Sequence, residues 1–179
     1  FHNIEVEDEA TIYAEYENGA TGVFITSTGD CPGTNRLEIT GTRGKTVLEN
    51  GILKLWKLKE DERDICKNAT EGYVNPETEY SEFTAEREEA HAGILKNFAN
   101  AILHGEELLS PGYDGINELM ISNAAYLSEW TGNKRITLPF DTAEFDRLLA
   151  EKQKNSEIKD NTVKKSTDKS CGGRWQVNW

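Results

Sequence analysis

The sequence predicts an α+β fold in which helices pack on one face of an open, mostly antiparallel β-sheet. Short segments of alternating polar and apolar residues, separated by glycine-containing turns, fill the range 10–58. Two longer segments between residues 90 and 132 repeat apolar residues at helical spacing. The elements do not alternate as strand, helix, strand, and no Gly-x-Gly-x-x-Gly occurs. A Rossmann domain is therefore not expected in this chain.

Five strands are expected in the first third of the chain, and consecutive strands are joined by short turns. The dipeptides Asn18-Gly19 and Asn50-Gly51 are typical of hairpins. The segment from Gly41 to Thr46 ends like a phosphate-binding loop but lacks that loop's first glycine, so it is interpreted as another hairpin turn. Short connections favour an antiparallel meander. The expected strands are 11–16, 22–28, 36–40, 46–48 and 52–58.

The segment 59–91 is strongly acidic, with eleven carboxylate and four basic side chains. Such a segment is usually a solvated excursion between elements, which is the interpretation favoured here. The alternative is an acidic binding surface.

Two helices and a short third one are expected in the second half. The first has an apolar stripe and ends at Gly105, and Asp114 is expected to cap the second, which ends at Gly132. A short strand is expected at 136–138. Asp141 and Glu144 have capping-box spacing for the last helix. The first stripe consists of Ala90, Ile94, Leu95, Phe98, Ala101 and Ile102.

The composition indicates one domain, residues 1–150, followed by a polar tail, residues 151–179. Within this tail, 153–169 is expected to be mobile and 174–179 could form a terminal strand. The chain starts at Phe1 and its single methionine is Met120, so a piece of a longer protein is expected.

Charge and hydropathy exclude two classes of partner. The formal net charge of −12 makes nucleic acid an unexpected partner, and no apolar run reaches the roughly 20 residues of a membrane helix. The three cysteines are odd in number and fit no zinc motif, so reduced thiols and a cytoplasmic location are expected.

Two places carry side chains suited to ligand contact. His91 lies on the first helical stripe, where a histidine is usually a satisfied, partly buried residue; a polar contact to a ligand is the alternative. The loop from Asp30 to Arg36, with Cys31 and Asn35, offers a carboxylate, a thiol, an amide and a guanidinium group, or is simply a polar turn. No triad and no metal-ligand cluster is found, so no catalytic or metal residue is predicted.

Several strings, in order and spacing, resemble the C-terminal domain of Gfo/Idh/MocA-type oxidoreductases, the glucose–fructose oxidoreductase and inositol dehydrogenase family. The resemblance covers roughly residues 5–149. The strings are Val6 to Ala10, Tyr16 to Gly22, Leu37 to Gly44, Asn97 to Gly105, Pro111 to Gly115, Ala124 to Ser128 and Leu138-Pro139.

The resemblance implies a substrate-binding and oligomerisation domain of an NAD(P)-dependent oxidoreductase acting on a sugar, cyclitol or related polyol. NAD or NADP would be bound by an N-terminal Rossmann domain, and the family's catalytic Asp-x-x-x-His helix would precede Val6. This chain alone is therefore expected to be inactive and to hold no cofactor residue. Substrate contacts are implied at Cys31, Asn35, Arg36 and His91.

The resemblance also implies a homodimer or homotetramer formed through the open sheet face. The alternative function is a non-enzymatic, β-rich binding or assembly module of the same fold, since fold does not fix function.

Overall fold

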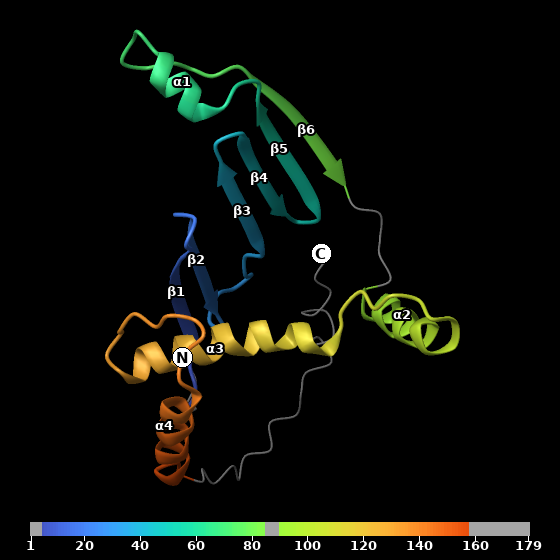
Figure 1. Ribbon diagram of the computed structural model, residues 1–179, viewed down its shortest axis with the longest axis vertical. Helices are drawn as coiled ribbons and strands as arrows, with labels where there is room; N and C mark the ends of the chain where they lie inside the picture. Colours follow the sequence, from blue (N-terminus) through green and yellow to red (C-terminus); the bar gives the residue numbers. More distant parts are fainter. Residues whose placement is uncertain (1–4, 85–89, 158–179) are drawn as a thin grey trace. The chain divides into compact units, whose positions relative to one another are not determined.

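The computed structural model describes residues 5–84 and 90–157 (Figure 1). Its contacts divide the chain into two compact units, which are described separately. Of the described residues, the first unit comprises 5–31 and 90–157, and the second comprises 32–84. The described residues form antiparallel sheets and α-helices, so the predicted α+β class is confirmed.

The first unit begins with a β-hairpin. Strands β1 (Glu9–Glu15) and β2 (Thr21–Ser27) pair antiparallel. In the turn, the Asn18 carboxamide oxygen accepts a hydrogen bond from the Ala20 amide at 3.0 Å, and Gly19 adopts a φ of 84°. The positive φ explains why the sequence has glycine there, and the predicted hairpin is confirmed.

The two faces of this hairpin differ in burial. Alternate β1 residues, Ala10, Ile12 and Ala14, are half-buried. Tyr13 and its cross-strand partner Val23 lie on the opposite face and are exposed. The hairpin therefore keeps an apolar outer face.

Helices α3 (Gly115–Trp130) and α4 (Thr142–Lys154) form the core of the first unit. Trp130 stacks on Phe145 with ring centroids 5.4 Å apart, and Leu127 is buried beside them. The Tyr126 hydroxyl donates to Glu7 at 2.6 Å, and the Arg135 guanidinium pairs with Glu15 at 2.9 Å. These contacts fasten the hairpin to α3 and to the segment that follows it.

The start of α4 agrees with the sequence. The Asp141 carboxylate accepts from the Ala143 amide at 2.9 Å, as its capping spacing predicts. The helix continues to Lys154, so its last turns lie inside the segment predicted to be a polar tail. The rest of the predicted mobile segment, from residue 158 on, and the predicted terminal strand lie outside the described residues.

Helix α2 (Ala90–His104) ends where predicted, at Gly105 with a φ of 72°. Asn97, only 6% exposed, fixes the segment that follows. Its amide nitrogen donates to the Glu106 carboxylate and the Glu107 carbonyl, and its oxygen accepts from the Leu109 amide, all at 2.8–2.9 Å.

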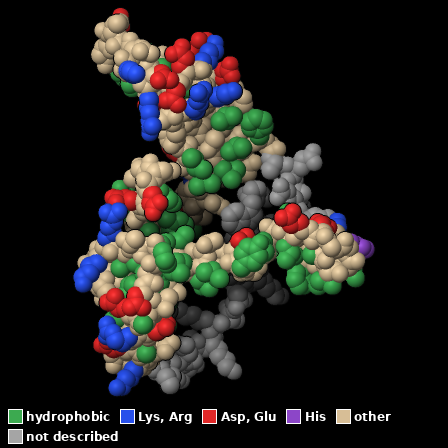
Figure 2. Space-filling model, viewed as in Figure 1, with side chains coloured by type: hydrophobic (Ala, Val, Ile, Leu, Met, Phe, Trp, Pro, Cys, Tyr) green, Lys and Arg blue, Asp and Glu red, His purple; other side chains and the backbone are tan. Residues whose placement is uncertain are grey.

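The apolar stripe of α2 remains at the surface. Figure 2 shows hydrophobic side chains gathered on this helix. The stripe residues that stay exposed are Ile94, Leu95, Phe98 and Ile102.

Two local predictions in the first unit are wrong. Asp114 makes no side-chain capping bond, because it belongs to a 3₁₀ turn (η1, Gly112–Asp114) and has helical angles instead of the extended angles of a capping residue. Residues 136–138 form no strand: no described strand pairs with them, and three residues of suitable propensity need a partner to become a strand.

The second unit is built on a four-stranded meander (Figure 1). All neighbouring strands pair antiparallel and follow chain order, as predicted for the middle strands. The strands are β3 (Arg36–Gly41), β4 (Gly44–Glu49), β5 (Ile52–Leu58) and β6 (Thr78–Thr84).

The acidic segment contains two elements that the sequence interpretation missed, α1 (Glu62–Asn68) and β6. It is therefore not only a solvated excursion. At the start of α1, the Asp61 carboxylate accepts from the Thr42 hydroxyl at 2.8 Å and from the Arg63 amide at 3.0 Å. These hydrogen bonds hold the pKa of Asp61 below its usual range, and the bond from Thr42 has the largest effect.

The two faces of the four-stranded sheet have opposite character. On one face, four large apolar side chains occupy directly paired positions and form what we call the apolar row: Leu37, Leu48, Leu53 and Phe83. Each is exposed, by 38–56%. The opposite face is charged and aromatic, and it carries the candidate site.

Candidate functional site

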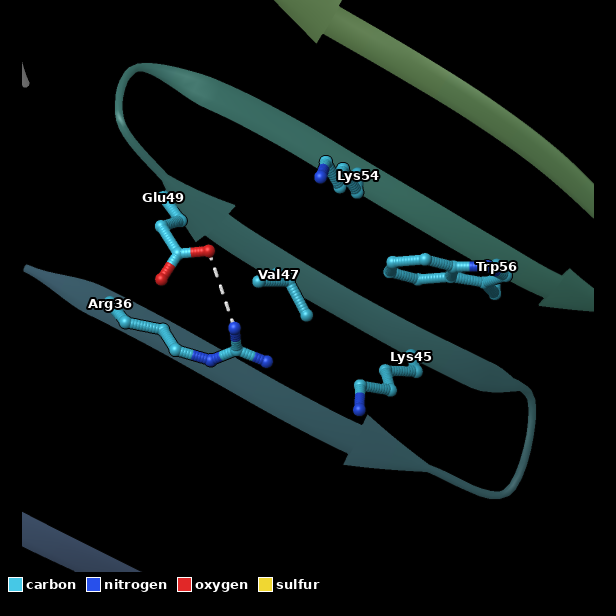
Figure 3. Close-up of a pocket in the computed structure, with 6 residues that line it drawn as sticks. All are labelled: Arg36, Lys45, Val47, Glu49, Lys54 and Trp56. Carbon is cyan, nitrogen blue, oxygen red and sulfur yellow. Dashed lines mark hydrogen bonds and ion pairs between the residues drawn. The ribbon is translucent and has the colours of Figure 1, made fainter.

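A recess of about 370 Å³ lies on the charged face of the sheet (Figure 3). Strand alternation brings its side chains to one face, because residues two apart in a strand point the same way. Val47, 3% exposed, lies at its centre. The lining residues are Arg36 from β3, Lys45, Val47 and Glu49 from β4, and Lys54 and Trp56 from β5.

An ion-pair network orients the β3 and β4 side of the recess. The Arg36 guanidinium contacts Glu38 at 2.6 Å and Glu49 at 3.3 Å, and the Lys45 ammonium contacts Glu38 at 2.5 Å. Two hydrogen bonds lower the pKa of Glu38; the bond from Lys45 has the largest effect, and the bond from Arg36 has the next largest. The hydrogen bond to Glu38 in turn raises the pKa of Arg36. Because these side chains are about 40% exposed, the network orients the donors more than it stabilises the fold.

The β5 side of the recess is formed by an aromatic ring and a lysine. Trp56 packs against its cross-strand partner Tyr80 with ring centroids 5.2 Å apart. Tyr80 in turn donates to Glu82, which raises the pKa of the Tyr80 hydroxyl. Lys54 is half-buried, and no ion pair of Lys54 is found among the described residues. The recess thus combines a flat apolar surface with charged hydrogen-bonding groups.

The structure brings one of the four predicted substrate-contacting residues into this recess, Arg36. Asn35 directly precedes β3 and is exposed. Cys31 and His91 are exposed and belong to the first unit. The position of His91 on the apolar stripe predicted a partly buried side chain, and that prediction is wrong because His91 is exposed.

The other recess residues were not singled out from the sequence. Lys45, Lys54 and Trp56 come from separate strands, and only the pairing register places them together. The usable signal was the alternation of charged and apolar residues in the third to fifth predicted strands.

The described residues do not fit a nicotinamide dinucleotide. Every strand pairing among them is antiparallel, whereas the dinucleotide site needs parallel strands and a glycine-rich turn into a helix. In the same residues no cluster of three or more metal-ligating side chains is found, and no helix is long and apolar enough to cross a membrane.

Comparison with known families identifies the chain. A family model described as "Oxidoreductase family, C-terminal alpha/beta domain" matches residues 1–138. A comparison with curated proteins finds no relative. The match covers most of the chain, spans both units and agrees with the observed α+β class. The chain therefore belongs to the Gfo/Idh/MocA oxidoreductase family and is its C-terminal alpha/beta domain.

Proposed function

We propose that this chain is the substrate-binding and oligomerisation domain of an NAD(P)-dependent oxidoreductase that acts on a sugar, cyclitol or related polyol. The observation that carries the proposal is the family match over residues 1–138. The nucleotide would be bound by a Rossmann domain of the whole protein, because the residues described here offer no dinucleotide site.

In this proposal the chain supplies substrate contacts and no acid–base chemistry. Cys31, Asn35, Arg36 and His91 remain the proposed contacts. All four are exposed, and Arg36 and His91 offer nitrogen groups that can hydrogen-bond to hydroxyls. Polar groups of this kind fix the orientation of a small ligand, while the cofactor performs the hydride chemistry.

This chain alone is expected to bind neither NAD nor NADP. Isothermal titration calorimetry of the 179-residue chain with each nucleotide should show no saturable heat up to millimolar concentration. The reason is the absence of a parallel strand–helix–strand unit among the described residues. Saturable binding in the low micromolar range would contradict the proposal that a separate Rossmann domain binds the nucleotide.

The enzymatic role is tested on the chain joined to its nucleotide-binding domain. Formation of NADH or NADPH at 340 nm, with a panel of sugars, cyclitols and polyols, should identify a substrate. His91→Ala is expected to raise the KM about tenfold, the usual effect of losing one hydrogen bond to a ligand. His104→Ala, on the same helix, is the control and should leave the KM unchanged.

A joined protein that binds the nucleotide but oxidises none of these substrates would favour the non-enzymatic binding or assembly module. Equal effects of the two histidine substitutions would remove His91 from the proposed contacts.

We expect the chain to self-associate through the apolar row of Leu37, Leu48, Leu53 and Phe83. These side chains adjoin across all four strands and are exposed, and apolar patches of this kind usually mark contact sites. A twofold pairing of like faces is the commonest arrangement. Light scattering after size exclusion, at micromolar concentration, should give a multiple of the 20.1 kDa monomer mass.

The substitution Leu53→Glu should shift this equilibrium to the monomer, because it places a charge in the middle of the row. Thr40→Glu is the matched control: Thr40 lies on the opposite face, where Lys45 is its cross-strand partner. A monomeric unsubstituted chain, or equal effects of both substitutions, would contradict this role of the apolar row.

A further inference from the structure

Two Asn-Gly dipeptides close hairpins in this chain, and they are held differently. Asparagine before glycine is chemically labile, because glycine has no side chain to shield its backbone nitrogen from the preceding carboxamide. Asn18-Gly19 closes the β1–β2 hairpin, and Asn50-Gly51 closes the β4–β5 hairpin. Both asparagines are exposed. The hydrogen bonds around each dipeptide indicate which of the two reacts.

At Asn18-Gly19, both groups that would react are engaged. The attacking group would be the backbone nitrogen of Gly19, which donates to the Tyr16 carbonyl at 2.9 Å. The group under attack would be the Asn18 carboxamide, whose oxygen accepts from the Ala20 amide at 3.0 Å. Such local bonds hold the side chain and the turn in one arrangement. A reaction there requires both hydrogen bonds to break.

At Asn50-Gly51, neither group is engaged. In the part of the chain that the structure describes, no hydrogen bond of the Asn50 side chain or of the Gly51 amide is found. Both residues have a positive φ, 54° and 73°, as in a two-residue type I′ turn. The attack requires Asn50 to leave this left-handed conformation, which is unfavourable for a residue with a side chain. Opening of this turn therefore relieves backbone strain and breaks no hydrogen bond of the two reacting groups.

We propose that Asn50 is a site of spontaneous deamidation. The backbone nitrogen of Gly51 attacks Cγ of Asn50, so the N–Cγ bond forms and the Cγ–Nδ2 bond breaks. Ammonia leaves with the proton of the Gly51 N–H. Water then opens the cyclic succinimide: attack at Cγ gives aspartate, and attack at the main-chain carbonyl carbon gives isoaspartate. The reaction needs no reagent other than water.

Isoaspartate at position 50 would alter the turn that joins β4 to β5. In this product the main chain runs through Cβ and Cγ of residue 50, so the turn becomes longer. A new carboxylate lies next to Glu49, which pairs with Ile52 across the turn. A two-residue type I′ turn matches the twist of its flanking strands, and a longer main chain loses that match. We therefore expect the strand pairs nearest the turn to loosen.

The test follows deamidation of the full 179-residue chain by peptide mapping and mass spectrometry. Trypsin releases Asn50 in the peptide 46–54 and Asn18 in the peptide 1–36, and a sample taken at time zero corrects for the digestion. Asn50 should react at least about fivefold faster than Asn18, the effect of one or more hydrogen bonds on a rate. Asn18 reacting as fast as Asn50, or faster, would overturn the proposal.

The same chain in guanidinium chloride is the control for the effect of neighbouring residues. Unfolding removes both turns and their hydrogen bonds, so the two asparagines should then react at similar rates. If Asn50 kept its full advantage in the unfolded chain, the sequence around it and not the turn would set the rate, and the structural argument would be wrong.

The substitution Asn50→Asp separates the added charge from the added length. It gives residue 50 a carboxylate without lengthening the main chain, and aspartate tolerates the left-handed conformation much as asparagine does. Amide signals of β4 and β5 in nuclear magnetic resonance should stay close to those of the fresh chain. An aged chain that contains isoaspartate should instead show a second set of signals next to the turn. A single, unchanged set in that aged chain would refute the expected loosening.

Discussion

Gly44→Ala is expected to destabilise the four-stranded sheet by about 3 kcal/mol or more. Gly44 starts β4 with a φ of 140°, a conformation that residues with a side chain rarely adopt. A Cβ placed there would lie 2.0 Å from the carbonyl oxygen of Trp56 on the neighbouring strand. The clash is with backbone, so neither strand can relieve it by a change of rotamer. Urea unfolding followed by circular dichroism measures the loss.

Gly41→Ala is the matched control for this prediction. Gly41 pairs with Gly44 at the same end of the hairpin, but no atom lies within 4 Å of the Cβ that it would gain. The control should change the free energy of unfolding by less than about 1 kcal/mol. If Gly44→Ala were as stable as Gly41→Ala, the close pairing of β4 with β5 described here would be wrong.

The same substitution affects the recess, because β4 carries three of its lining residues. Separating β4 from β5 would move Lys45 and Val47 away from Lys54 and Trp56. The site is a property of the strand register and not of any one strand.

Much of the fold could be predicted because local chemistry and tertiary packing agree. Asn18-Gly19 closes a hairpin wherever it lies between two alternating segments, and Gly105 ends a helix with a positive φ. Such features depend on neighbouring residues only. The family match over residues 1–138 confirms the family resemblance, and two of its strings include the turn at Gly19 and the helix end at Gly105.

The missed strand β6 shows where local reasoning fails. Tyr80 and Phe83 are three residues apart, so they lie on opposite faces and give no apolar alternation. Glu82 between them, and Glu77 and Glu79 before them, suggested solvent exposure. The strand forms because β5 offers an edge to pair with, and Tyr80 packs on Trp56 there. Pairing of this kind is a tertiary effect that a single segment does not reveal.

The candidate site was predicted only in part for a related reason. Arg36 was singled out from the composition of its loop, without knowledge of its partners. Glu38 and Glu49, which orient it, are two and thirteen residues away, and only the second contact depends on the β3–β4 register. Lys54 and Trp56 join the site through a second strand pairing. A surface built from three strands needs the register before its members can be named.

The first unit depends most on the ring of Phe145. This side chain is 9% exposed and stacks on Trp130 with ring planes 18° apart, while Phe140 packs at 6.2 Å. Phe145→Ala would remove the contact between α3 and α4 and leave a cavity. The expected loss is about 3–5 kcal/mol, the range for aromatic residues truncated in a core. Denaturant unfolding monitored by tryptophan fluorescence and by hydrogen exchange of α4 amides measures it.

Phe98→Ala is the control that separates burial from residue type. Phe98 lies on α2 with 55% of its surface exposed, so its truncation should cost less than about 1 kcal/mol. A domain is stable by only about 5–15 kcal/mol, so Phe145→Ala should expose the first unit to proteolysis at a temperature where Phe98→Ala resists it. Similar losses for both substitutions would mean that the α3–α4 contact is not the core of this unit. A large loss for Phe98→Ala alone would instead show that the α2 stripe is buried in solution, by self-association or by contact with another part of the protein.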